Sequence, residues 1–179
     1  MNRKIILCPI GEVEGKVLDF LRKDLEKTFN CRVEKHAAIE MPAGVLNRVR
    51  KQYLAVPVLT KLHRLVPTDS QDRVLGVADV DLYAEGLVFV FGQAELGGSC
   101  AVISLTRLRQ SYYSLPENEA HFLERANKEA VHELGHVFGL QHCPDTECVM
   151  HFSNSLMDTD KKQATFCARC GKLLVGLME

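Results

Sequence analysis

Residues 132–142 of the chain read HELGHVFGLQH. In a helix, side chains four residues apart lie on the same face, so His132 and His136 can bind one metal ion. Glu133 follows about 100° further round the helix, because one turn takes about 3.6 residues. We therefore expect its carboxylate beside the ion, where it can reach a metal-bound water without being a ligand itself.

His142 can join the other two histidines only if the helix ends before it. In a continuous helix, His142 would lie about 9 Å along the axis from His136, at about 1.5 Å per residue. Gly139 allows the chain to turn, because glycine adopts the left-handed conformation that often ends helices. Three histidine nitrogens with one open position describe a catalytic zinc site.

Four of the seven cysteines cluster after this motif, and the last two form a Cys-x-x-Cys pair. The four are Cys143, Cys148, Cys167 and Cys170. Four thiolates with no open position are typical of structural zinc. Disulfides would need an oxidising compartment, which nothing in the sequence suggests. A redox Cys-x-x-Cys would leave the first two cysteines unexplained, and an iron–sulfur cluster remains an alternative use of all four.

The pattern His-Glu-x-x-His-x-x-Gly-x-x-His is the metzincin signature, and most of the chain resembles the archaemetzincin family. The specific part of the resemblance consists of that signature, His142-Cys143, Cys148-Val149-Met150 and the late Cys-x-x-Cys. Residues 52–53, 89–94 and 104–109 also look like family segments. The first fifty residues are similar mainly in their pattern of strands and helices.

The resemblance implies a zinc-dependent metallopeptidase. His132, His136 and His142 would hold the catalytic zinc, and Glu133 would be the general base that activates water for attack on the peptide bond. The substrate would be a peptide or a protein.

The resemblance also implies a second, structural zinc, which makes two zinc ions per chain. Its ligands would be Cys143, Cys148, Cys167 and Cys170. Met150 would form the methionine turn beneath the catalytic site, with Met157 as a weaker candidate. Many metzincins carry a tyrosine shortly after this methionine, but no tyrosine follows Tyr113 here. The group that stabilises the oxyanion besides zinc is therefore not identified by the sequence.

The predicted elements alternate as in an α/β fold. We expect a twisted mixed β-sheet with one antiparallel edge strand, packed against helices that include the zinc-binding one. Predicted strands cover residues 5–10, 31–33, 74–80, 87–91 and 100–105. Predicted helices cover residues 13–29, one or two segments of 45–65 around Pro57, 115–139 and 173–177. Ser114 to Glu117 fits a capping box that would start the active-site helix.

Residues 87–93 are the candidate for a strand along the edge of the substrate cleft, as in the related metzincin fold. Such a strand can pair with an extended peptide through main-chain hydrogen bonds. The alternative is an ordinary edge strand with no part in binding.

The length of 179 residues fits one metalloprotease domain, 1–179. We expect residues 1–142 to form the sheet and helices, including the active-site helix 115–139, and residues 143–179 to form a cysteine subdomain around the second zinc. A net charge of −1 gives no footprint for nucleic acid, and no run approaches the ~20 apolar residues of a membrane span. We predict a monomer in the cytoplasm, where thiols stay reduced.

Two other functions stay open at this point. One is a zinc-stabilised binding protein with negligible turnover, although such a protein has no physical need of Glu133. The other is a DNA-associated protease of the SprT type, which would require a basic surface that the charge balance does not supply.

Several further residues have simple structural interpretations. Cys8, Cys31 and Cys100 lie in apolar or strand-like runs, which favours buried small hydrophobic side chains. The remaining histidines lack ligand spacing among themselves and are expected at the surface or as caps; they are His36, His63, His121 and His151. A substrate carboxylate near the cleft is a weak alternative role for Arg107 and Arg109.

Overall fold

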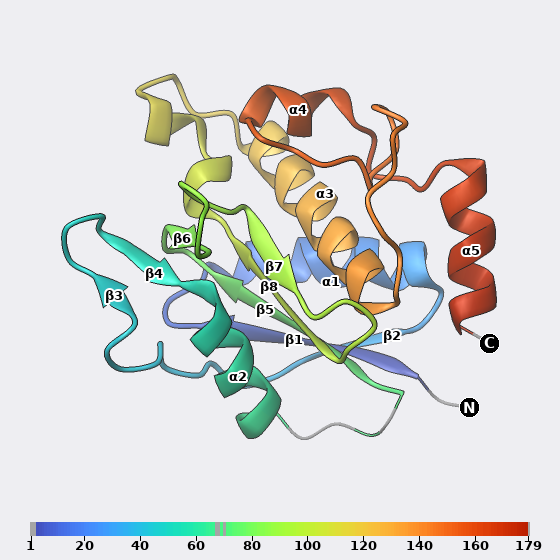
Figure 1. Cartoon of the computed structure of the whole chain (residues 1–179), viewed down its shortest axis with the longest axis horizontal. Helices are drawn as coiled ribbons and strands as arrows, with labels where there is room; N and C mark the ends of the chain where they lie inside the picture. The colour runs from blue at the N-terminus through green and yellow to red at the C-terminus, as the bar shows by residue number, and fades with distance from the viewer. Residues whose placement is uncertain (1–2, 67–68, 70, 179) are drawn as a thin grey trace.

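The computed structural model describes residues 3–66, 69 and 71–178, and it has a five-stranded sheet at its centre (Figure 1). The order is β2-β1-β5-β8-β7. The first four strands are parallel, and β7 runs antiparallel to β8 at the edge. This confirms the predicted mixed sheet with one antiparallel edge strand. The bounds are Lys4–Ile10 (β1), Arg32–Lys35 (β2), Arg73–Ala78 (β5), Gly92–Ala94 (β7) and Cys100–Ser104 (β8).

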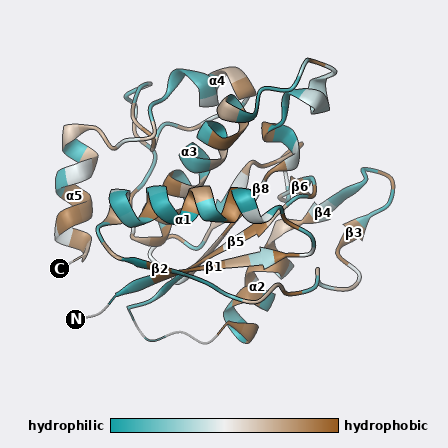
Figure 2. Ribbon diagram, turned by 180° about the vertical axis from the view of Figure 1, so that it is seen from behind, coloured by the Kyte–Doolittle hydropathy of each residue, from teal (hydrophilic) through white to brown (hydrophobic). Residues whose placement is uncertain are grey.

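Helices cover both faces of this sheet. The long helices α1 (Gly15–Phe29) and α3 (Glu119–Val137) share one hydrophobic core with one face. Helix α2 (Ala55–Leu65) packs on the opposite face with a second, smaller core. Helix α1 is amphipathic, and Figure 2 shows hydrophilic and hydrophobic segments alternating along its ribbon.

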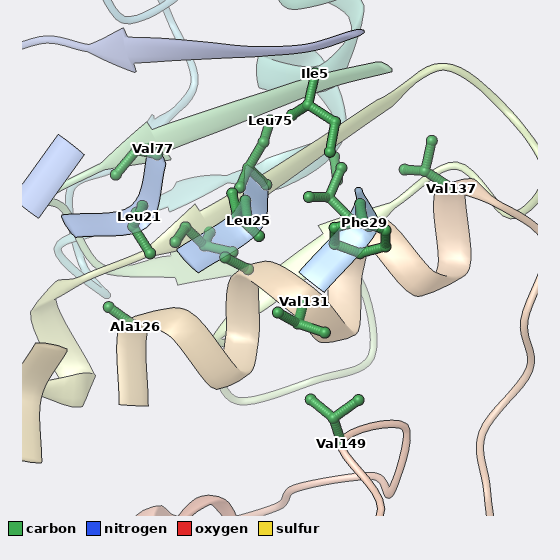
Figure 3. Close-up of a cluster of buried hydrophobic side chains, with 14 of the residues drawn as sticks. Ile5, Leu21, Leu25, Phe29, Leu75, Val77, Ala126, Val131, Val137 and Val149 are labelled. Atoms are coloured by element: carbon green, nitrogen blue, oxygen red, sulfur yellow. The ribbon is translucent and has the colours of Figure 1, made fainter. Parts of the chain in front are cut away.

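Helix α3 is buried from two sides (Figure 3). Ala126 and Val131 of α3 belong to the core that includes Leu25 of α1 and Leu75 of β5. Val149, in the chain that follows α3, packs from the other side and is fully buried. A helix covered on both sides must bury its polar residues as well as its apolar ones, and α3 therefore carries His132 and Glu133 into the interior.

A small second sheet replaces part of a predicted helix. Within residues 45–65 only α2 is helical, and it is preceded by a turn that Asn47 holds: its Oδ1 accepts hydrogen bonds from the amides of Val49 and Arg50, both at 3.1 Å. Pro57 lies in the first turn of α2, where a missing N–H costs no helical hydrogen bond. The sheet has the order β3-β4-β6, with β3 at Leu46–Asn47, β4 at Gln52–Leu54 and β6 at Leu82–Tyr83.

The active-site helix is shorter than the predicted 115–139, and the predicted capping box is wrong. The N-cap is Asn118, whose Oδ1 accepts from the amide of His121 at 3.1 Å. Ser114 instead adopts a left-handed conformation with φ of 57°. Glu117 accepts from the amide of Ser111 at 3.2 Å, so its carboxylate holds the preceding turn.

The segment after α3 contains more helix than the sequence predicts. Helix α4 (Leu156–Lys161) was not predicted, and α5 (Ala168–Met178) extends well beyond the expected 173–177. Two short 3-10 helices, Thr106–Leu108 (η1) and Gln110–Tyr113 (η2), follow β8. Cys8 and Cys100 are buried as expected, whereas Cys31 is only partly buried. Among the described residues, no helix has the length and apolar character to cross a membrane.

Gly135 in the middle of α3 provides a test of how α3 packs. A Cβ atom at this position would overlap the sulfur of Met150, whose side chain is fully buried and cannot swing into solvent. We expect Gly135→Ala to lower the free energy of unfolding by about 1–2 kcal/mol, because overpacking outweighs the gain in helix propensity. Denaturant unfolding of the zinc-loaded protein measures this change.

The matched control is Gly171→Ala in α5, where a Cβ atom would meet nothing within 4 Å. Its expected effect is neutral or stabilising by up to about 1 kcal/mol. A Gly135→Ala protein as stable as this control would contradict the tight packing of Met150 on α3.

Candidate active site

Three histidines from the sequence motif converge at the end of α3. The Nε2 atom of His136 lies 3.1 Å from that of His132 and 3.2 Å from that of His142. A tetrahedral zinc with Zn–N bonds of about 2.0–2.1 Å holds its nitrogens about 3.3 Å apart. The spacing of the three rings therefore fits one zinc ion.

The hydrogen bonds of two Nδ1 atoms determine that His132 and His136 direct their Nε2 atoms toward the point where the three rings meet. His132 Nδ1 lies 2.7 Å from the carbonyl oxygen of Val149, and His136 Nδ1 lies 2.7 Å from that of Leu140. A carbonyl only accepts hydrogen bonds, so each Nδ1 must carry a proton and each neutral ring leaves a bare lone pair on Nε2. Two lone pairs facing each other at about 3 Å repel unless a cation lies between them. The donor set fits a metal ion on chemical as well as geometric grounds.

The chain reverses after α3 in the way that the sequence predicts. Gly139 has a φ of 103°, and its amide donates to the carbonyl of His136 at 2.9 Å. The amide of Leu140 donates to the carbonyl of Gly135, also at 2.9 Å. These two bonds form a Schellman motif, which ends the helix and returns His142 toward the other histidines.

Glu133 lies beside the histidines with its side chain buried in α3. Burial raises the pKa of its carboxyl well above the usual range, and the neighbouring Glu129 raises it further. Burial also lowers the pKa of His132, His136 and His142, which keeps the imidazoles neutral as metal binding requires. A bound cation would lower the pKa of Glu133 again.

Gly92 in the edge strand β7 contacts Glu133 directly. A Cβ atom on Gly92 would lie 2.6 Å from both Cγ and Oε1 of Glu133. Glycine is therefore required here for space, because any larger residue would displace the carboxylate. The sequence contained no signal for this contact.

A buried ion pair lies behind Glu133. Lys162 Nζ is 2.9 Å from Glu129 Oε1, with exposed side-chain fractions of 0% and 4%. The ammonium group has no well-aligned hydrogen-bond acceptor within the described part of the chain, so the contact is chiefly electrostatic. Glu129 precedes Glu133 by one helical turn and could have been found from that spacing; Lys162, at the end of α4, could not.

The histidines and Glu133 line a cleft of about 510 Å³. Residues 86–94 contribute one wall, and residues 152–154 contribute to the other. The ring of Phe152 lies 4.9 Å from that of His142, and Leu87 and Val88 are exposed at the rim. The cleft is therefore open to solvent, apolar at its edges and polar at its floor.

The predicted cleft strand at residues 87–93 is only partly correct. The strand β7 covers 92–94, whereas the preceding residues form a loop with one bridge at Val90. Arg50 donates to the carbonyl oxygens of Leu87 and Val88 at 2.9 and 2.5 Å, and Gln52 Nε2 also donates to Val88 at 3.0 Å. The side chains of Arg50 and Gln52 thus bind the carbonyl oxygens that would otherwise form hydrogen bonds with a neighbouring strand.

The four late cysteines form a separate group. Their sulfur atoms all lie within 4.8 Å of one another, with Cys143 and Cys167 at 3.9 Å. Zn–S bonds of about 2.3 Å imply sulfurs about 3.8 Å apart, so the group also fits one zinc ion. The amide of Cys170, at the start of α5, lowers the pKa of Cys167 to about 7.

Other predicted residues have clear positions. Met150 is fully buried against Gly135 in α3, whereas Met157 is largely exposed. Arg107 binds Asp81 through two hydrogen bonds of 2.7 and 2.8 Å. Arg109 pairs with Asp79 at 2.6 Å. Both arginines thus have internal carboxylate partners, which removes the reason to assign them a substrate carboxylate.

Comparison with known proteins gives the family. Residues 13–175 match Peptidase family M54. The archaemetzincin of Methanocaldococcus jannaschii is 44% identical over 174 residues, which cover 97% of this chain and 94% of the relative. The crystal structure of archaemetzincin from Methanopyrus kandleri has a TM-score of 0.87 at 39% identity, covering 99% of this chain and 96% of that one. That of Archaeoglobus fulgidus archaemetzincin, complexed with malonate, has a TM-score of 0.81 at 40% identity, covering 94% and 98%.

These relatives confirm the resemblance and the predicted fold class. They do not favour a binding protein without turnover or a protease of the SprT type. The chain therefore belongs to peptidase family M54, the family of the archaemetzincins, and is a zinc-dependent metallopeptidase that acts on peptides or proteins.

Proposed function

We propose that His132, His136 and His142 hold the catalytic zinc and that Glu133 is the general base of peptide hydrolysis. The observation that carries this proposal is the convergence of the three Nε2 atoms, with His136 3.1 Å from His132 and 3.2 Å from His142, beside a buried carboxylate in an open cleft. When bound, zinc supplies a Lewis acid that polarises the scissile carbonyl and lowers the pKa of water.

Glu133 performs the proton transfers. Its carboxylate takes one proton from the attacking water as the new C–O bond forms at the carbonyl carbon. It then gives that proton to the nitrogen of the leaving amine as the C–N bond breaks. Its position against Gly92 holds the carboxylate at the cleft floor, so it serves both steps without moving away.

We also propose that β7 binds the substrate as an added strand. Phe91 accepts from the amide of Ser104 at 2.8 Å, and Glu95 donates to the carbonyl of Cys100 at 3.0 Å. In an antiparallel ladder the bonding alternates, so the peptide groups of Gly92 and Ala94 point away from β8, toward the cleft. An extended peptide can pair with these groups, which positions its main chain without reading its side chains.

Replacing Glu133 tests the proposed base. Glu133→Gln keeps the size of the side chain but cannot take a proton, so kcat on a peptide library should fall by about 10²–10⁴-fold with the zinc content unchanged. Glu119→Gln is the matched control, because Glu119 lies exposed in the first turn of the same helix. A Glu133→Gln protein that cleaves peptides as fast as the parent would exclude the mechanism.

Gly92→Ala tests the contact between the edge strand and the base. The added methyl group should displace the Glu133 carboxylate and lower kcat by about tenfold or more. The metal content and the main-chain groups of β7 that would pair with the substrate should be unchanged. Gly171→Ala provides the comparison for a harmless methyl group. Unchanged kcat in Gly92→Ala would show that Glu133 has free space and is not held by β7.

We further propose that Cys143, Cys148, Cys167 and Cys170 hold a structural zinc, which gives two ions per chain. Support comes from the mutual distances of the four sulfur atoms and from the preference of structural zinc for four thiolate ligands. We propose that residues 143–179 form the subdomain that this ion stabilises within a single 1–179 domain.

Thiol reactivity tests the structural zinc. In chelator-treated protein at neutral pH, iodoacetamide should modify Cys167 first, because its pKa is about 7, and added zinc should suppress the reaction. Cys8, whose pKa burial raises to about 11, is the internal control and should react slowly. If zinc does not protect Cys167, or if elemental analysis finds one zinc per chain, the proposal fails.

The remaining features of the chain stay as proposals. We propose a monomer, and the proposed lack of nucleic-acid partners is supported by the net charge of −1 and by the mixed signs of charge in surface ion pairs. A cytoplasmic location is supported by the seven cysteines, none of which forms a disulfide, because a reducing compartment keeps thiols in this state.

A further inference from the structure

A third group of metal-ligating side chains lies away from the catalytic cleft. It consists of His63 near the end of α2, Glu95 directly after β7, and Cys100 at the start of β8. One ligand atom from each lies within 4.8 Å of the other two. Cys100 belongs to the core on the α2 side of the sheet, whereas the catalytic histidines lie on the α3 side.

The three side chains already share contacts through Ser99. Cys100 Sγ is 4.0 Å from His63 Nδ1, and Ser99 Oγ lies 3.1 Å from that nitrogen and 3.6 Å from the sulfur. The amide of Ser99 donates to Glu95 Oε2 at 3.3 Å. A nitrogen, a carboxylate oxygen and a sulfur are thus directed toward one small region.

The turn between β7 and β8 is built to fold Glu95 back over this region. Gly98 donates its amide to the carbonyl of Glu95 at 2.9 Å. A Cβ atom on Gly98 would lie 2.5 Å from Glu95 Cβ and 2.8 Å from its Oε2. Only glycine leaves space for the carboxylate in this position, so the sequence Glu95 to Cys100 favours the cluster.

We propose that His63, Glu95 and Cys100 bind a third transition-metal ion of the zinc class. A thiolate with an imidazole suits zinc and similar borderline-soft ions, whereas calcium and magnesium prefer oxygen ligands alone. Zn–S and Zn–N bonds in a tetrahedral site place sulfur and nitrogen about 3.5 Å apart, so the observed 4.0 Å requires only a small rotation of the side chains.

Binding would exchange a proton for the metal. The thiol of Cys100 releases its proton to solvent as the metal–sulfur bond forms, and the open fourth position takes a water molecule or Ser99 Oγ. His63 is exposed, so an ion can reach the site directly from solvent. The same turn contacts the catalytic helix, because the amide of Gly97 donates to the carbonyl of His136 at 2.9 Å.

Equilibrium dialysis of the purified holoprotein against buffered free Zn²⁺ tests the site. The parent should bind about one ion more per chain at saturation than His63→Ala or Cys100→Ser, or bind that ion at least about tenfold more tightly, since even outer-shell partners are worth about 10–100-fold in affinity. Dialysis against Co²⁺ should add a thiolate-to-cobalt charge-transfer absorption that Cys100→Ser reduces.

Cys31→Ser is the matched control, because Cys31 is a partly buried thiol outside all three ligand groups among the described residues. It should bind as many ions as the parent. His63 is exposed, so His63→Ala should fold even if Cys100→Ser does not. Identical binding curves for the parent and His63→Ala would overturn the site, and a loss in His63→Ala alone, with Cys100→Ser folded and unchanged, would overturn the thiolate ligand.

Discussion

The hydrogen bond from His132 Nδ1 to the carbonyl of Val149, 2.7 Å long, joins the catalytic helix to the cysteine-bearing loop. Val149 follows Cys148 directly, and the amide of Cys143 donates to the carbonyl of Met150 at 2.9 Å. The loop that carries two of the late thiols therefore sets the tautomer and orientation of a histidine ring. An ion that fixes the cysteines would also fix this carbonyl, so structural and catalytic zinc would be linked through one turn of chain.

Burial of charge explains why α4 is needed. Glu129 and Glu133 lie one turn apart on α3, and two buried carboxylates at this spacing repel each other. Lys162, just beyond α4, supplies the compensating charge at 2.9 Å from Glu129. Removing one member of a buried ion pair costs about 3–5 kcal/mol, because the other charge is left unpaired. Lys162, which caps the six-residue helix α4, thus allows the Glu133 carboxylate to remain buried one turn away from a second carboxylate.

Features encoded within one short segment could be predicted from the sequence, and features that depend on distant partners could not. The periodicity of α1, the histidine spacing and the turn at Gly139 are local, and each matches the structure. Arg50 donates hydrogen bonds to the carbonyls of Leu87 and Val88, which follow it by 37 and 38 positions in the sequence. These bonds stabilise a loop where the sequence predicts a strand. His63 and Cys100 are 37 positions apart and share no periodic pattern, so their proximity appears only once α2 covers the sheet.

Gly92 lies between Glu133, the proposed base, and the edge of β7 that we propose to bind the substrate. Its Cα side packs against the Glu133 carboxylate, while the ladder register directs its peptide groups away from β8, toward the cleft. A peptide paired with β7 would therefore be placed relative to the same backbone atoms that hold Glu133. The substrate and the carboxylate would then be positioned against one common residue, which favours a fixed distance for proton transfer. Any side chain at this position would separate the two, because it would occupy the volume of the carboxylate.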